Sequence, residues 1–445
     1  MKQSVTILLL LFSFLNLLAQ GGQIELTLDE AVKKAITASP DVRKLALADQ
    51  KNDYELKSFR SAFLPQVSGQ LQLNFNPVLP TQRIPDFFGG DLTKTIPVQF
   101  GTFQSHQATV SVNQVIYSKA LQTGSDVLKK TFELNAINQQ MKNEELTNSI
   151  AKLYFQTQGL QYQIKNVQAN IDNLKKLGEV SKARQEVGLG LGIDTDRIQI
   201  NLNNLQSQIE ILKSQEQSLM DIINILTGQK AGTKLTLTTT ELEAYDGTAA
   251  YLDSDKVKNR TIDLLDKQKE VLSAQITSNL AQNGPTLAAF AQMGGQIQGD
   301  KLDIFIKKEN YAFFGGFGLQ LNVPIYNGKK YQNKVKSIEM ELLQIDEDKN
   351  LLKQGLEQQY VNAFQTLYAN KQQKNSQDEN VSLAQKTYAI TQDRYNQGVA
   401  PLTDLMDAQK SLIEAQNMAL LTDLQIKLAQ IDLLNIEGNI QEIIR

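Results

Sequence analysis

The stretch RYNQGVAPLTDLMDAQ, from Arg394 to Gln409, interrupts one long helical pattern and begins another. Gly398 is the kind of residue that ends a helix where the chain reverses, and Pro401 favours a new helix in its first turn. The stretch therefore predicts a hairpin of two antiparallel helices. The first half of the chain predicts a similar hairpin, with Arg184 near the end of one helix and Gly188 at the reversal.

Long helices are predicted on both sides of these turns. No proline lies between Pro97 and Pro285 or between Pro324 and Pro401, so helices there are not broken. Residues from about 119 to 187 have one continuous helical pattern, which at 1.5 Å per residue is on the order of 100 Å. Heptad spacing predicts coiled-coil seams at the following positions: Leu202, Leu205, Ile209, Leu212, Leu219, Ile223 and Leu226, interrupted by Glu216, then Leu405, Ala408, Leu412, Ala415, Ala419, Thr422, Ile426, Ala429, Leu433 and Ile436.

Four segments alternate instead with the period of a β-strand: 66–76, 106–114, 313–323 and, more weakly, 286–299, where Phe290 falls on the wrong face. Strands of about 10 residues cross a bilayer at a tilt. A half-buried sheet of a soluble protein is the alternative for any one strand, but four strands in a secreted, mainly helical chain favour the membrane. The residues predicted to face lipid are Leu71, Leu73, Phe75, Val110, Val112, Leu319 and Leu321.

Residues 1–19 are predicted to be a cleaved signal peptide, because Lys2 precedes an apolar run that is too short to span a bilayer comfortably. A retained N-terminal anchor is the alternative. No later segment has the apolar length of a transmembrane helix. The chain has no cysteine and one histidine, His106, which excludes disulfides, thiolate metal sites and a lipid anchor on cysteine, and argues against histidine-based sites. A net charge of -3 argues against nucleic-acid binding.

The chain also predicts an internal repeat. The motif VNQVIYS at Val112 corresponds to LNVPIYN at Leu321, and Asp196 corresponds to Asp404 if the first turn is two residues longer. We predict a first repeat at residues 20–230, a connecting segment at 231–255 with a short strand in KLTLTTT, and a second repeat at 256–445. Each repeat has the order helix, strand, strand, long helix, turn, helix. The proline-rich residues 77–97 are predicted to form a long loop between the first two strands.

Several motifs, taken in order, resemble the TolC-like outer-membrane efflux protein family over nearly the whole mature chain. Each half opens with a helix start such as LTLDEAVKKAITASPDVRKL. The helix-to-strand crossings FLPQVSGQ and NGPTLAAF, and the strand-to-helix crossings QVIYSK and VPIYNGKK, are similar to the family's. The turn RYNQGVAPLTDLMDAQKSLIEAQ carries its most recognisable motif.

The resemblance implies a homotrimer, in which each copy gives four strands to a shared 12-stranded barrel in the outer membrane. Long antiparallel coiled-coil helices would form an α-barrel that extends into the periplasm. The expected function is a passive exit duct for efflux or type I secretion, with no cofactor and no enzymatic activity. The expected partners are outer-membrane lipids, a periplasmic adaptor and an inner-membrane transporter. Physical reasoning alone requires oligomerisation, since spanning strands must close and four are too few. It leaves a dimer or a trimer open.

The resemblance also assigns roles at the hairpin turns. Asp404, Asp407 and Asp196 match acids around the periplasmic entrance, and Tyr395 matches a tyrosine that holds it closed, although the family's arginine partner falls at Ala400. The alternative for the acids is complementing a helix dipole, and the two interpretations stay open. Gly188, Gly398 and Pro401 are expected at the adaptor-facing tip.

Two other functions are alternatives to the duct. A periplasmic coiled-coil scaffold with a soluble sheet is the alternative from another class. An enzyme is disfavoured because no catalytic groups converge in the sequence, and VGLGLGID follows a helix rather than the strand that a phosphate loop requires. The sequence does not specify the exported cargo.

Overall fold

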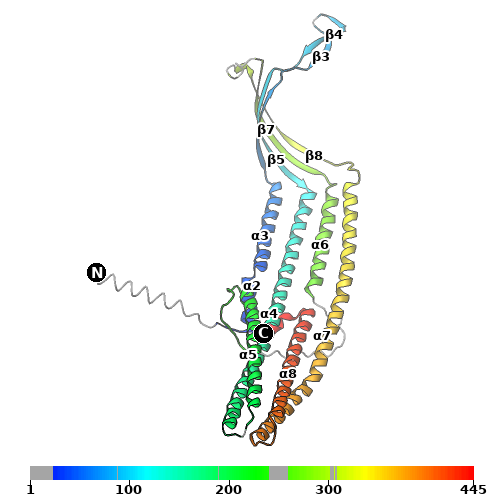
Figure 1. Ribbon diagram of the computed structural model, residues 1–445. Coiled ribbons are helices and arrows are strands. Elements are labelled where there is room, and N and C mark those ends of the chain that lie inside the picture. Colours follow the sequence, from blue (N-terminus) through cyan, green and yellow to red (C-terminus); the bar gives the residue numbers. More distant parts are fainter. Residues whose placement is uncertain are drawn as a thin grey trace, which may run out of the picture. The chain divides into compact units, whose positions relative to one another are not determined.

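The computed structural model describes residues 24–87, 89–188, 190–239, 259–300, 305 and 308–444. The signal peptide predicted for residues 1–19 and much of the predicted connecting segment lie outside these residues. The chain is mainly helical, as predicted (Figure 1). Its helices are α2 (Leu28–Ala38), α3 (Pro40–Arg60), α4 (Lys119–Glu186), α5 (Gly192–Leu226), α6 (Arg260–Ala281), α7 (Lys330–Asn396) and α8 (Leu402–Ile436), with short 3-10 turns η1 (Ser61–Phe63), η3 (Lys308–Asn310) and η4 (Ile440–Ile444).

Four long strands form one antiparallel sheet in the order β2, β5, β7, β8. They are β2 (Gln66–Phe75), β5 (Gln104–Ser118), β7 (Thr286–Gly299) and β8 (Tyr311–Asn322). All four predicted strands are therefore confirmed. Within the described residues β2 and β8 are the edges of this sheet, so each has one side of its backbone without a strand partner.

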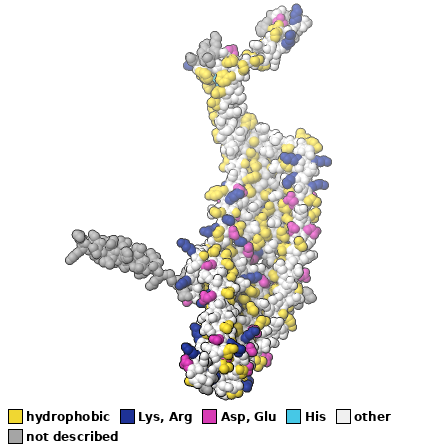
Figure 2. Space-filling view, in the orientation of Figure 1, with side chains coloured by type: hydrophobic (Ala, Val, Ile, Leu, Met, Phe, Trp, Pro, Cys, Tyr) yellow, Lys and Arg dark blue, Asp and Glu magenta, His cyan; other side chains and the backbone are white. Residues whose placement is uncertain are grey.

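The register places the predicted apolar side chains on one face. Leu71 lies opposite Ala108, and Val110 lies opposite both Gly69 and Met293, so residues of the same phase line up across the sheet. Leu319 and Leu321 on β8 continue this face. The side chains are exposed in the single chain, with Leu71 70% exposed and Leu319 68% exposed. Figure 2 shows hydrophobic side chains on the strands, whereas blue and magenta charged side chains lie mainly over the helices.

The predicted loop at residues 77–97 is corrected by the structure, because most of it forms a hairpin of β3 (Thr81–Asp86) and β4 (Asp91–Gln99). Ile84 pairs with Ile96, and β-branched residues favour such pairs. The prolines suggested a loop, but within the described residues each of these strands pairs with one neighbour only, and a missing N–H donor is tolerated on the other edge. The Asp86 carboxylate accepts from the Gly89 N–H at 2.6 Å and stabilises the turn.

The chain consists of two compact units. Among the described residues, the first contains 24–47, 135–188, 190–239, 259–266 and 346–444. Its core includes Tyr154 and Phe155, and the Tyr154 hydroxyl donates to the carbonyls of Leu26 and Thr238 at 2.9 and 2.6 Å. These carbonyls flank the parallel pair of β1 (Ile24–Leu26) and β6 (Leu235–Leu237), which confirms a short strand in KLTLTTT.

The coiled-coil seams predicted for α5 and α8 are confirmed, since their residues are buried or half-buried. Leu405 and Leu433 are fully buried. Glu216, which interrupts the α5 seam, accepts from the Gln161 side chain at 2.9 Å, so its carboxylate is satisfied. Within the described part of the chain, no helix is both long and apolar enough to cross a membrane.

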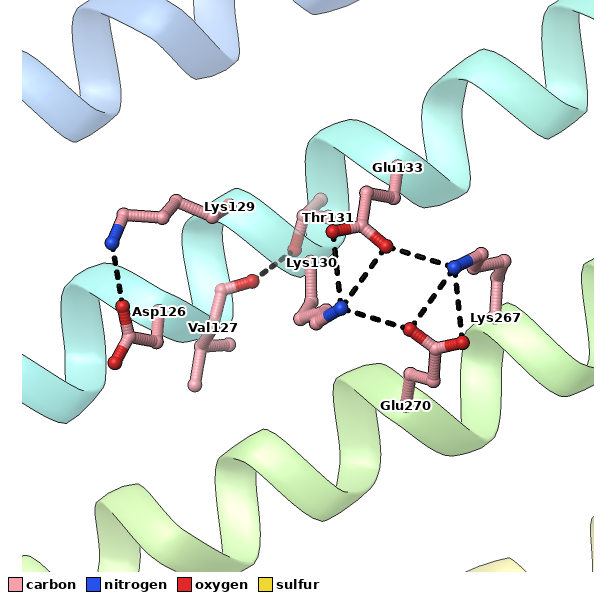
Figure 3. A network of polar contacts seen from close by, with 8 residues as sticks. All are labelled: Asp126, Val127, Lys129, Lys130, Thr131, Glu133, Lys267 and Glu270. Atoms are coloured by element: carbon pink, nitrogen blue, oxygen red, sulfur yellow. Dashed lines mark hydrogen bonds and ion pairs between the residues drawn. The ribbon is translucent and has the colours of Figure 1, made fainter.

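The second unit contains residues 48–134 and 267–345, and a four-membered ion-pair network joins two of its helices (Figure 3). Lys130 on α4 contacts Glu133 and Glu270 at 3.0 Å each. Lys267 on α6 contacts Glu133 at 2.8 Å and Glu270 at 3.0 Å. Hydrogen bonds from the two lysines lower the pKa of both carboxyls, so the network is fully charged at neutral pH.

Candidate functional site

Both helical hairpins turn through a glycine in the left-handed region. Gly188 has φ +77° and Gly398 has φ +76°, a conformation that residues with a Cβ rarely adopt. The Gly398 N–H donates to the Tyr395 carbonyl at 2.9 Å and so ends α7. The sequence predicted Pro401 in the first turn of α8, but it is the N-cap, one residue before that turn. Its side chain offers no hydrogen-bond acceptor to the helix.

Asp404 and Asp407 are both exposed on α8. Asp404 lies in the first turn, where its charge complements the helix dipole. Asp407 lies beyond that turn, and the dipole effect falls off within the first turn. Neither carboxylate forms an ion pair with a described residue. Dipole stabilisation therefore accounts for Asp404, whereas the Asp407 carboxylate has no stabilising partner among the described residues.

Tyr395 is held by an arginine from the other hairpin. The Arg184 guanidinium lies 5.0 Å from the centre of the Tyr395 ring, within cation–π range. Its Nη1 donates to the Tyr395 carbonyl at 2.9 Å and its Nη2 donates to the Asn396 carbonyl. The arginine thus caps the C-terminus of α7, where cations are favoured. The sequence identified Arg184 only as a repeat position, and nothing local signals this contact.

The Tyr395 ring also belongs to a buried apolar cluster. It is 5% exposed and packs with Leu402 and Leu405 against α4 and α5 residues that include Leu177 and Ile198. The hydroxyl has no hydrogen-bond partner among the described residues. Tyr395 therefore contributes its ring and its carbonyl, rather than its hydroxyl, to the junction of the two hairpins.

A cleft of about 460 Å³ separates the two turns. Arg184, Arg197 and Thr403 contribute polar groups to its wall, and Tyr395 and Pro401 contribute apolar surface. Within the described ranges, no group of three or more His, Asp or Glu side chains is arranged to hold a metal ion.

The helix bounds change the correspondence between the turns. Gly188 and Gly398 are 210 residues apart, α5 begins at Gly192 and α8 begins at Leu402, so the two turns have the same length. Buried positions agree with this register, since Leu202 corresponds to Leu412. Asp404 then corresponds to Asp194, rather than to Asp196 as the sequence predicted. The discrepancy arises because Gly192 lies in the first turn of α5 instead of lengthening the loop.

This combination of long helical hairpins and one amphipathic antiparallel sheet defines a class of outer-membrane channel proteins. The sequence model described as Outer membrane efflux protein matches residues 31–227 and 256–439, so the chain belongs to that family. The family consists of outer-membrane channels of tripartite efflux systems and not of enzymes. Membership implies the outer membrane, with an extension into the periplasm.

Individual proteins agree with this assignment. The chain is 21% identical to the outer membrane protein TolC of Vibrio cholerae over 394 residues. This alignment covers 84% of this chain and 82% of that protein. Its fold is similar to that of the CmeC outer membrane channel of Campylobacter jejuni, with a TM-score of 0.71 and 13% sequence identity. The superposition covers 93% of this chain and 85% of CmeC. The fold is also similar to that of CusC, with a TM-score of 0.70 and 14% sequence identity. That superposition covers 92% of this chain and 91% of CusC.

Proposed function

We propose that the chain is the outer-membrane exit duct of a tripartite export system and that it acts as a homotrimer. The observation that carries the proposal is the four-stranded sheet, which has one apolar exposed face, one uncharged polar face and, among the described residues, two edges without a strand partner. In lipid, an unpaired strand edge is strongly unfavourable, so β8 of one copy pairs with β2 of the next.

Three copies of four strands form a 12-stranded barrel, above the lower limit of about eight strands for a membrane barrel. The apolar face, with Leu71, Leu73 and Leu319, contacts lipid, and the polar face lines a watery lumen. This arrangement explains why large side chains such as Phe313 and Phe317 are 85% and 90% exposed in the single chain. On a soluble scaffold, the same face would be an unprotected apolar patch.

The helical hairpins form the periplasmic entrance and contact an adaptor, with Gly188, Gly398 and Pro401 at the tips. Three copies of Asp404 and Asp407 form a ring of carboxylates at the opening. A ring of acids attracts cations and favours their passage. Asp407 supports this role most, because the dipole of α8 does not account for it.

The duct conducts passively, and an inner-membrane transporter supplies both the energy and the choice of cargo. Whether it serves drug efflux, metal efflux or protein secretion depends on that transporter. Purified protein in planar bilayers tests the proposal. We expect stable ion-conducting channels from a detergent-extracted membrane fraction. Recovery of the protein in the soluble periplasmic fraction without detergent, and no conductance, would support the scaffold instead.

A further inference from the structure

The polar face of the sheet has no Asp, Glu, Lys or Arg on any of its four strands, and most of its side chains are amides and hydroxyls. One row across it contains Ser68, Ser111, Gln292 and Gly316, and the hydroxyls of the two serines are 2.8 Å apart. Two aromatic residues break this pattern. Phe290 on β7 and Phe314 on β8 share the polar face.

Phe290 leans across the neighbouring strand. It lies opposite Gly318, and a Cβ built on Gly318 would be 3.0 Å from the Phe290 Cζ. The Cβ atoms of directly opposed residues are about 4.5–5.5 Å apart, and an upright ring would keep its tip at least that far away. The Phe290 ring therefore occupies the space above Gly318, against the wall of the sheet.

Phe314 makes the reciprocal contact. It lies opposite Gly294, and a Cβ on Gly294 would be 2.8 Å from the Phe314 Cζ and 2.5 Å from the Ala108 carbonyl oxygen. Gly316, between the two pairs on β8, is different, because a Cβ there would meet nothing within 4 Å. The two rings thus lie over Gly318 and Gly294, on either side of the unoccupied space above Gly316.

We propose that Phe290 and Phe314 form an aromatic binding site on the lumen wall for the planar apolar rings of exported small solutes. Gly318 and Gly294 keep the bore open, because they let the two phenylalanine rings lie against the wall. The proposal rests on the proposed function, in which the polar face lines the lumen. Three copies would place six such rings in an otherwise uncharged, amide-rich passage.

The chemistry favours ring-bearing solutes over charged or fully polar ones. Both phenylalanine rings are half-buried, so part of each remains accessible to a solute. Offset stacking of one aromatic ring on another is favourable beyond simple burial of apolar area. No charged group on these strands competes for an ionic solute, and amides such as Gln292 hydrogen-bond polar substituents at the ring edge.

Single-channel conductance tests the role of the glycines. Gly318→Ala would place a methyl carbon 3.0 Å from the Phe290 Cζ, so we expect the ring to shift off the wall toward the lumen and the conductance to fall. Gly316→Ala is the matched control on the same strand and face, and it leaves conductance unchanged. Neither glycine has a positive φ, so alanine causes no backbone strain at either position. Adding Phe290→Ala to Gly318→Ala restores conductance, since the displaced ring is removed.

Equal conductance of the Gly318→Ala, Gly316→Ala and wild-type channels would overturn the role proposed for Gly318. A wild-type trimer that does not conduct at all would overturn the exit-duct proposal itself, so the two failures are distinguishable. If Gly318→Ala does not assemble, the Gly318→Ala/Phe290→Ala variant tests the proposal instead. Assembly and normal conductance of this double variant would show that the alanine at 318 clashes with the Phe290 ring. Failure of the double variant to assemble or conduct would overturn the claim that Gly318 makes room for the Phe290 ring.

Solute binding tests the aromatic site directly, without a glycine variant. Caffeine, a neutral planar solute, should reduce or interrupt the current, whereas sucrose at equal concentration changes it only through viscosity. Phe290→Ala/Phe314→Ala should weaken the caffeine effect about two- to tenfold, the range that one aromatic stacking contact provides. An identical caffeine response in the wild-type and double-alanine channels would overturn the binding site.

Discussion

Replacing Arg184 should loosen the junction of the two hairpins. The side chain donates two charge-assisted hydrogen bonds to the last carbonyls of α7 and lies 5.0 Å from the Tyr395 ring centre. Hydrogen bonds to charged groups contribute roughly 1.5–3 kcal/mol each, and an exposed cation–π contact about 0.5–1 kcal/mol. Arg184 is half-buried and a single flexible side chain makes all three contacts, so we expect a total loss of about 2–4 kcal/mol for Arg184→Ala.

The assay is hydrogen exchange at the ends of α4 and α7, together with resting conductance in planar bilayers. Arg184→Ala should exchange faster there and conduct more at rest. Arg184→Lys should be intermediate, because an ammonium group lacks the planar fork that reaches two carbonyls. Arg394→Ala is the matched control, since Arg394 is exposed and forms no side-chain bond with a described residue.

Equal exchange and equal conductance for Arg184→Ala and Arg394→Ala would refute the reasoning. Tyr395→Phe extends the test, because it removes only a hydroxyl that lacks a hydrogen-bond partner among the described residues. We expect its resting conductance to stay close to wild type. A strongly leaky Tyr395→Phe channel would show that the hydroxyl acts between copies of the chain.

Three further predictions concern lipid contact, the entrance and pH. Leu71→Arg should lower the yield of assembled protein in outer membranes more than Gln70→Arg, since a lipid-facing charge near the midplane costs roughly 2–4 kcal/mol; equal yields would show that the faces are reversed. Asp404→Asn with Asp407→Asn should reduce cation selectivity while the oligomer stays intact, and unchanged selectivity would leave these acids as hairpin residues only. Because hydrogen bonds from Lys267 and Lys130 lower the Glu270 pKa below 4.5, its stabilising contribution is present at neutral pH and lost as the pH falls through that lowered value. After correction for the intrinsic pH dependence of amide exchange, the protection of α6 amides should fall at acid pH, and Glu270→Gln should reduce this dependence.

Features with a local period were predictable from the sequence. Strand phase follows from alternation, so Leu71 and Val110 could be placed on one face before their register was known. The α8 seam follows from heptad spacing in the same way. In both cases, the information lies within one segment of the chain.

Features that depend on distant contacts were not predictable. Arg184 and Tyr395 are 211 residues apart, and no pattern around either one indicates their pairing. Phe290 contradicted the alternation of its strand, because the space that it fills is created by Gly318 on another strand. The hairpin formed by β3 and β4 was missed because its prolines signal a loop, although free strand edges tolerate them.

The central claim is that the four bilayer-length strands of one chain cannot close alone and that three chains close them into one barrel. Native mass spectrometry of the detergent-extracted protein measures this most directly. The account predicts a complex of three chains that dissociates on heating, with loss of β-structure upon dissociation. A stable monomer that retains its full strand content would contradict it, because its open edges at β2 and β8 would then be compatible with a membrane environment.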